Sequence, residues 1–276
     1  PVAFNKHYGK LNQGTSIFQK EAIQRFRKDL NEVMITEENN LPVTVNRKED
    51  KIEISPEQKQ RYAQIEKQYE KEKAKEKGKK KKAIEEGDDE EGRSGSSAAS
   101  ARRNSAHYRN LHDDDIKTNA KLQHALTILD SHWNKKNSSG APRKISFHYT
   151  NDIARQGMLE ALKSKGISED QIVTIKSGMS DSAKKKAIAK YQSDPSTRII
   201  FLSPAGQTGI NLQRGDVQIS LDRPSTASLQ DQGEARQVRN GRQNFANENW
   251  IHYIDTDTPY DQLKYSLVKK KGLIGG

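Results

Sequence analysis

The feature that most constrains the fold is a regular alternation of short apolar runs and longer amphipathic segments over residues 144–272. The runs are rich in isoleucine, valine and phenylalanine, which is typical of strands buried on both faces of a sheet. This alternation predicts an α/β fold, in which helices cover both faces of a parallel sheet. Strands are expected at 144–148, 171–175, 198–202, 217–221 and 250–254.

Helices are expected between these strands, because the intervening segments repeat apolar residues at helical spacing and end in turn residues. Ligands of such sheets bind beyond the carboxyl ends of the strands. The loops that directly follow strands are therefore the first candidates for a functional site. The predicted helices cover 151–165, 180–191, 228–238 and 258–272, with a further one ahead of the first strand at 116–133.

Composition divides the chain into three regions, 1–70, 71–110 and 111–276, of which the last carries the alternating pattern. In the first region, residues 17–33 have an amphipathic helical pattern, and 51–54 alternate like a short strand. A second helix is expected to start at Ser55, with Gln58 closing a capping box.

The middle region, 71–110, is of low complexity. Four lysines at 79–82 precede an acidic segment at 85–91, and a stretch of glycine, serine and alanine follows. So few apolar residues cannot offset the entropy lost on ordering. We expect a flexible insertion that is dispensable for folding. A contact with nucleic acid, or a nuclear-import signal, is the alternative interpretation of the lysine run.

The net charge of +11 favours a polyanionic partner, and nucleic acid is the commonest one. The alternative is a soluble protein with a lysine-rich tail. Cysteine is absent, which predicts a reducing, intracellular compartment. No apolar run approaches the about 20 residues of a membrane helix, so no membrane partner is expected. Because the first residue is Pro1, we interpret the chain as a fragment of a longer protein.

The first candidate loop, at 203–212, follows the expected strand at 198–202. Gly206 and Gly209 allow the backbone to turn sharply and to approach a ligand closely. Exposed backbone N–H groups in such a loop can hold phosphates. By itself, a glycine-containing loop of this kind is more often an ordinary turn.

The second candidate, at 230–242, lies beyond the expected strand at 217–221. Arg236 and Arg239 are three residues apart, so they would share one face of a helix. Two guanidinium groups on one face suit phosphate oxygens, whereas an isolated pair is more often a solvated basic face. Gly241 is expected to end the helix. Arg242 beyond it is expected to add charge and to tolerate replacement better than either arginine.

Together these two segments resemble the last two conserved motifs of superfamily 2 helicases. Residues 206–212 look like the fifth motif, and 232–242 look like the sixth, with glutamine, two arginines and glycine at the family spacing. The Swi/Snf-like branch is indicated by further blocks. Residues 41–42, 55–58 and 62 resemble its inter-lobe segment, 144–148 its fourth-motif strand, and 177–180 with 187–196 its next block.

The resemblance implies that the chain is the C-terminal RecA-like lobe of an ATP-dependent helicase or translocase. Arg236 and Arg239 would then reach the γ-phosphate of ATP, bound with Mg mainly by an N-terminal RecA-like lobe of the same parent protein. Residues implied to face the nucleotide are Gly209, Asn211 and Gln232. Residues implied to contact the backbone of nucleic acid, with DNA favoured, are Ser177, Gly178, Ser180, Ser203, Gly206 and Gln207.

Three positions depart from the Swi/Snf-like pattern. Ala235 stands where the family usually has glycine, Val238 where these members often have histidine, and Arg242 where they have glutamine. The departures bear on the subfamily rather than on the superfamily.

Two elements of a complete ATPase are absent from the sequence: a Gly-x-x-x-x-Gly-Lys-Ser/Thr loop, and an acidic box after an apolar strand. The fragment alone is therefore predicted not to hydrolyse ATP. The rival hypothesis is a non-catalytic basic module that binds nucleic acid, and a phosphate loop upstream of Pro1 would distinguish the two. Histidine and aspartate at 107 and 112–114 lack further spaced ligands, so no metal site is expected.

Overall fold

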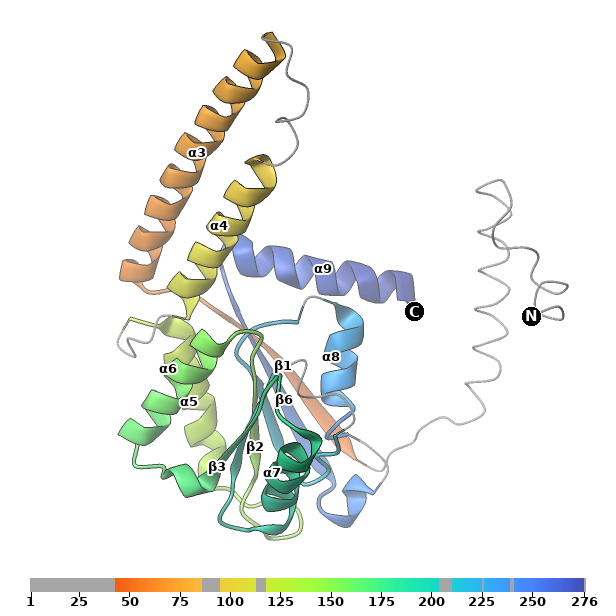
Figure 1. Ribbon diagram of the computed structural model, residues 1–276. Helices are drawn as coiled ribbons and strands as arrows, with labels where there is room; N and C mark the ends of the chain where they lie inside the picture. The colour runs from red at the N-terminus through yellow and green to blue at the C-terminus, as the bar shows by residue number, and fades with distance from the viewer. Residues whose placement is uncertain are drawn as a thin grey trace, which may run out of the picture. The chain divides into compact units, whose positions relative to one another are not determined.

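Six parallel strands form one sheet at the centre of the computed structural model (Figure 1). The structure describes residues 43–85, 95–112, 118–203, 210–224, 226–238 and 241–275. The strand order is β1-β6-β5-β2-β4-β3, and every neighbouring pair is parallel. The strands are β1 (Thr44–Ile52), β2 (Ile145–His148), β3 (Ile172–Ile175), β4 (Ile199–Leu202), β5 (Val217–Ser220) and β6 (Glu248–Thr256).

Most of the described helices lie between consecutive strands, as a parallel sheet requires, and one follows the last strand. The predicted α/β fold, with its RecA-like sheet and helices on both faces, is confirmed. The helices are α3 (Pro56–Glu85), α4 (Gly95–Leu111), α5 (Ala120–Trp133), α6 (Asp152–Ser164), α7 (Asp181–Ser193), α8 (Ala227–Glu234) and α9 (Pro259–Gly275). None of the helices in the described residues is long and apolar enough to cross a bilayer.

The two faces of the sheet differ in what they bury. On β4, Ile199 and Phe201 belong to an apolar cluster with α5 and α6, whereas Ile200 and Leu202 point to the opposite face and pack with Tyr191 of α7. This period-2 alternation explains why β4 is apolar at every position. The α7 side becomes polar toward the middle of the sheet, where the buried side chains are Ser146, Gln218 and Ser220.

β1 is an edge strand that the sequence does not predict at its full length. It pairs with β6 over nine positions, from Thr44 beside Glu248 to Ile52 beside Thr256. The alternation expected only at 51–54 is weak further upstream because the strand reads TVNRKEDKI. Charged side chains are compatible with an edge strand, where they discourage pairing with other chains. Residues 44–52 therefore belong to the sheet of the lobe.

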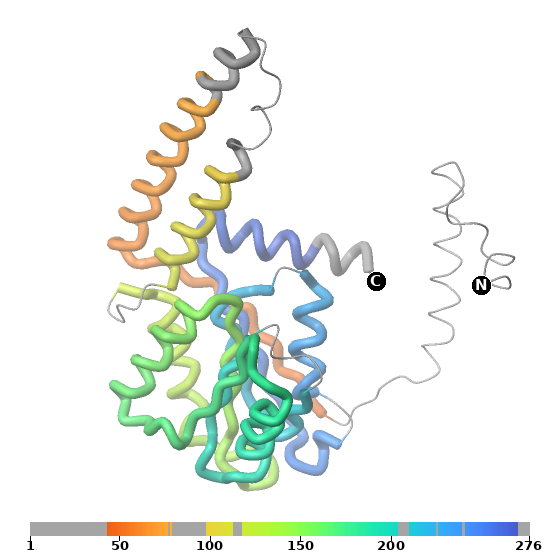
Figure 2. Tube along the Cα trace, in the orientation of Figure 1, coloured from red at the N-terminus to blue at the C-terminus, as the bar shows by residue number. Residues whose placement is uncertain are grey.

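Helices cover much of 71–110, the segment that was expected to be a flexible insertion. α3 continues to Glu85 and α4 begins at Gly95, and the two helices run side by side in opposite directions (Figures 1 and 2). Lysine, glutamate and alanine favour helix even without an apolar face. A count of apolar residues therefore underestimates the order of this segment. Residues 86–94 lie outside the described residues.

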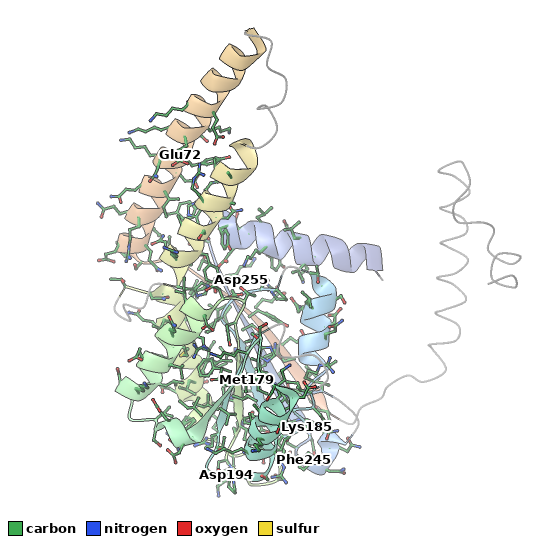
Figure 3. All side chains as sticks on the ribbon, in the orientation of Figure 1. Glu72, Met179, Lys185, Asp194, Phe245 and Asp255 are labelled. Carbon is green, nitrogen blue, oxygen red and sulfur yellow. The ribbon has the colours of Figure 1, made fainter. Side chains whose placement is uncertain are left out.

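The contacts between α3 and α4 are mostly polar. The rings of Tyr62 and His107 stack with their centroids 4.0 Å apart. Arg103 donates to both carboxylate oxygens of Glu66 at 2.8 Å. Further along the pair, Glu72 accepts a hydrogen bond from Arg102 at 3.1 Å (Figure 3). The hairpin is thus held by specific ion pairs and one aromatic stack.

Gln58 joins the hairpin to the rest of the lobe. The predicted capping box is confirmed, since the Gln58 backbone N–H donates to Ser55 Oγ at 3.1 Å and Ser55 N–H donates to Gln58 Oε1 at 3.3 Å. The buried amide of Gln58 also donates to the Asn110 carbonyl at 2.7 Å and accepts from Ala120 N–H at 3.1 Å. One side chain therefore connects the starts of α3 and α5 with the end of α4.

Candidate functional site

The candidate sixth motif begins in the last turn of a short helix. Thr226 caps α8, with its hydroxyl accepting from Leu229 N–H at 3.2 Å, and α8 ends at Glu234. Arg236 therefore lies in the turn after α8 and not on the helix expected to reach residue 238, which corrects the shared helical face proposed for it. Arg239 lies outside the described residues.

The turn that carries Arg236 packs on the candidate fifth motif. The N–H of Leu212 donates to the Arg236 carbonyl at 2.9 Å, and Arg236 Nη1 donates to the Ile210 carbonyl at 3.5 Å. Arg236 Nε is buried and has no hydrogen-bond partner in the described part of the chain. The two motifs, separated by a whole strand in sequence, are thus in direct contact. The Arg236 residue as a whole is only half-buried.

The loops after β3 and β4 lie together, because the two strands are neighbours and parallel. Ser203 N–H donates to the Ile175 carbonyl at 3.1 Å. Ser177 and Gly178 are exposed, and Gly178 has φ +81°, a conformation that favours glycine. Ser180 is exposed and caps α7, where its Oγ accepts from Ala183 N–H at 3.3 Å. Four of the residues expected to bind nucleic acid therefore share the carboxyl edge of the sheet.

Of the remaining predicted site residues, two are exposed on the surface and three lie outside the described residues. Asn211 is exposed, and its carbonyl accepts from Gln192 Nε2 at 2.7 Å. Gln232 is exposed on α8, where it donates to Ser228 Oγ at 3.3 Å. The other three, Gly206, Gln207 and Gly209, lie outside the described residues.

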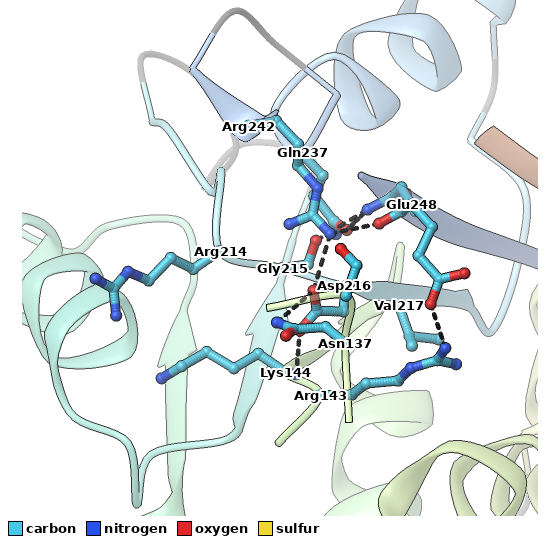
Figure 4. Close-up of polar contacts among 12 residues, drawn as sticks. Asn137, Arg143, Lys144, Arg214, Gly215, Asp216, Val217, Gln237, Arg242 and Glu248 are labelled. Carbon is cyan, nitrogen blue, oxygen red and sulfur yellow. Dashed lines mark hydrogen bonds and ion pairs between the residues drawn. The ribbon is translucent and has the colours of Figure 1, made fainter. Parts of the chain in front are cut away.

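Arg242, which was expected only to add charge beyond the end of the helix, is fully buried. It donates to Asp216 Oδ1 at 2.9 Å and to the carbonyls of Gln213 at 2.6 Å and Glu248 at 2.7 Å (Figure 4). Asp216 also accepts from Lys144 N–H at 2.8 Å. These contacts join the segments that enter β2, β5 and β6 at the amino edge of the sheet. Gly241 precedes them with φ +91°.

Arg223, just after β5, holds α8 in place and is not apparent from sequence motifs. Its guanidinium donates to both Asp255 oxygens, at 2.7 to 3.0 Å, and to Gln230 of α8 at 3.1 Å. It lies between the rings of Tyr253 and Tyr265, at 4.6 and 4.8 Å. The only sequence signal is an arginine that directly follows a buried strand, which is too general to predict this role.

A second anchor of α8 is Glu234. Its carboxylate accepts from Arg47 Nε of β1 at 2.8 Å and from the Tyr253 hydroxyl at 2.7 Å. The edge strand β1 therefore helps to hold the helix that precedes Arg236.

A small cavity separates α8 from the carboxyl ends of β2 and β5, and it is lined by His148, Gln218, Ser220, Asp222, Gln230 and Tyr253 among others. Burial lowers the pKa of His148 to about 3, so this ring is neutral at physiological pH. Gln218 Oε1 and Asp222 Oδ1 are buried without hydrogen-bond partners in the described residues. This is the polar face of the sheet beneath α8.

The histidines near the hairpin have structural contacts. His107 stacks on Tyr62 and contacts the Glu66 carboxylate. His112 Nε2 lies 3.6 Å from Asp222 Oδ2, and burial lowers its pKa to about 4. Within the described residues, no three histidine or carboxylate side chains are grouped as metal ligands would be. Asp113 and Asp114 lie outside those residues.

The order and direction of the strands, with helices on both faces, give the sheet the architecture of a RecA-like lobe. Residues 120–241 match the family described as the helicase conserved C-terminal domain. Residues 120–241 are therefore similar to helicase C-terminal domains, and the fold of the chain is similar to that of a solved SWI2/SNF2 ATPase C-terminal domain. No curated protein matches the sequence.

Three solved structures illustrate the likeness in fold. The Sulfolobus solfataricus SWI2/SNF2 ATPase core in complex with dsDNA has a TM-score of 0.60 and 16% identity, over 83% of this chain and 45% of that one. The C-terminal domain of the Sulfolobus solfataricus SWI2/SNF2 ATPase has a TM-score of 0.56 and 13% identity, over 81% of this chain and 85% of that one. The C-terminal part of the Fun30 ATPase domain has a TM-score of 0.55 and 16% identity, over 83% of this chain and 90% of that one. The chain thus spans less than half of the Sulfolobus core.

Proposed function

We propose that this chain is the second RecA-like lobe of an ATP-dependent nucleic-acid translocase or helicase. The observation that carries the proposal is the contact between the Arg236 turn and residues 210–212, which leaves Arg236 Nε without a partner in the described residues. Phosphoryl transfer develops charge that a positioned arginine stabilises, by about 10³–10⁵ in rate. Arg236 and Arg239 are the residues proposed for this role.

The nucleotide is proposed to be ATP with Mg, bound mainly by an N-terminal lobe of the parent protein. Asn211, Gln232 and Gly209 would complete the site from this lobe. The Mg ion would neutralise phosphate charge, whereas the arginines of this chain would position the γ-phosphoryl group.

The track is proposed to be nucleic acid, with DNA as the first choice. Ser177, Gly178, Ser180 and Ser203 offer hydroxyl and backbone donors at one edge of the sheet, and Gly206 and Gln207 are proposed for the same role on the motif resemblance alone. Neutral donors of this kind contact backbone phosphates and carry little sequence information. Support comes from the net charge of +11 and from the likeness in fold to a core solved with dsDNA.

The test is single-turnover ATP hydrolysis by the parent protein with both lobes. Arg236→Ala should lower the rate by about 10³-fold or more, and Arg236→Lys nearly as much, because lysine keeps the charge but lacks the planar fork. DNA affinity should change little, since the side chain would face the nucleotide. Arg102→Ala, on the exposed side of α4, is the matched control and should retain the wild-type rate.

The opposite result would give Arg236 a different role. If Arg236→Ala kept full turnover but weakened DNA binding, Arg236 would be a backbone contact, and the chain would fit a non-catalytic nucleic-acid-binding module better.

A further inference from the structure

The residue next to Arg236 is a fully buried glutamine. Gln237 Nε2 donates to Ser146 Oγ of β2, and Gln237 Oε1 accepts from Asn249 Nδ2 of β6 at 3.2 Å. Its side chain thus links the turn to two strands that are separated by β5. The Gln237 N–H donates to the Glu234 carbonyl at 3.0 Å, so the backbone is also tied to the end of α8.

Gly215 provides the space that the glutamine occupies. A Cβ at this position would lie 3.0 Å from Gln237 Cδ and 3.2 Å from the Leu212 carbonyl oxygen. The Gly215 carbonyl also accepts from Asn249 Nδ2 at 2.9 Å. The site is therefore built around the amide, with a close backbone approach that only glycine allows without a shift of its neighbours.

The sheet beneath the turn is polar, so hydrogen bonds contribute to the position of the turn. Ser146 Oγ donates to the Val217 carbonyl at 3.3 Å, and Gln218 Nε2 donates to Ser220 Oγ at 3.1 Å. Buried amides are costly unless they are hydrogen-bonded, and their bonds are directional. A few specific hydrogen bonds therefore help to set the position of the turn.

We propose that Gln237 is a positioning residue, whose hydrogen bonds to Ser146 and Asn249 fix the turn that carries Arg236. The Arg236 carbonyl accepts a hydrogen bond from Leu212 N–H at 2.9 Å. The side chain of the following residue, Gln237, is hydrogen-bonded to Ser146 in the sheet. The inference rests on the proposed role of Arg236. It adds that the sheet itself, through β2 and β6, determines where the guanidinium points.

The experiment compares Gln237→Met with Ser146→Ala and the double variant in the two-lobed parent. Methionine fills a similar volume without the hydrogen bonds. We expect kcat to fall about tenfold to a hundredfold, as a misplacement of about 1 Å would cause, while KM for ATP and DNA affinity change less than about threefold. The double variant should lose no more than Gln237→Met alone, because that substitution already removes the Gln237–Ser146 hydrogen bond that Ser146→Ala disrupts. Gln68→Met on exposed α3 is the control.

A second readout needs only the chain itself. The Nε–Hε NMR signal of Arg236, assigned by its loss in Arg236→Ala, should shift or broaden in Gln237→Met and in Ser146→Ala, but not in Gln68→Met. Melting temperatures are recorded for every variant. If Gln237→Met unfolds, Ser146→Ala, which preserves the glutamine, takes its place. Unfolding of both would make Gln237 a structural residue and overturn the proposal.

The outcomes separate the two proposals. If Arg236→Ala is inactive but Gln237→Met keeps wild-type kcat, the positioning role is wrong and the proposed function stands. If Arg236→Ala remains active, the proposed function fails, and the positioning role then depends on the NMR signal. An Arg236 signal unchanged by Gln237→Met would overturn it.

Discussion

At the residue scale, the guanidinium of Arg242 is enclosed by protein and neutralises the buried carboxylate of Asp216. We expect Arg242→Ala to reduce the free energy of unfolding by about 3–5 kcal/mol, because it leaves that carboxylate buried without its charge partner. Urea unfolding of the chain measures the loss. Arg214→Ala, an exposed arginine over the Phe245 ring at 4.7 Å, should cost less than about 1 kcal/mol.

The double variant Arg242→Met/Asp216→Asn distinguishes charge from packing. Removing both charges should restore part of the stability lost in Arg242→Ala, since a neutral pair leaves no uncompensated ion. The ion-pair explanation would be contradicted if the double variant lost as much free energy of unfolding as Arg242→Met and Asp216→Asn lose together as single variants.

At the element scale, the α3–α4 hairpin differs between its base and its tip. The base contains the buried side chains of Gln58, Tyr108 and Asn110. Replacing 75–98 with a short Gly/Ser linker should change the melting temperature by only about 2 °C, because loop closure costs little. Replacing 71–110 should lower it by roughly 5–10 °C, because buried contacts are lost and about 1 kcal/mol corresponds to 2–4 °C. Equal melting temperatures for the two deletions would show that the base contributes nothing.

At the scale of the whole molecule, buried neutral histidines should make the fold sensitive to acid. Burial lowers the pKa of His112 to about 4 and that of His148 to about 3. Unfolding lets each ring take up a proton below about pH 6.5. Stability should therefore fall as pH decreases from about 6.5 to 4, by about 1.4 kcal/mol per pH unit for each histidine.

Urea unfolding at pH 7 and pH 5 checks this expectation. His148→Asn should reduce the difference between the two pH values relative to the wild-type chain, whatever its effect at pH 7. An unchanged difference would show that His148 is not a source of the acid sensitivity.

The order of strands and helices follows from the sequence alone, because apolar periodicity and capping residues act over a few neighbouring positions. The strand at 198–202, the Ser180 cap of α7 and the capping box at Ser55 are all confirmed within a residue or two. The contact between Leu212 and Arg236 does not follow from the sequence, because β4 and β5 are separated in the sheet by β2.

Tertiary structure alone decided the features whose partners are distant in sequence. Arg242 is buried because Asp216 and the Glu248 carbonyl converge on it, and Gln237 is anchored because Ser146 and Asn249 lie on two separate strands. The length of β1 likewise depends on β6, about 200 residues away. No local pattern encodes such pairings: the same polar residue is solvated or buried according to which segments the fold brings beside it.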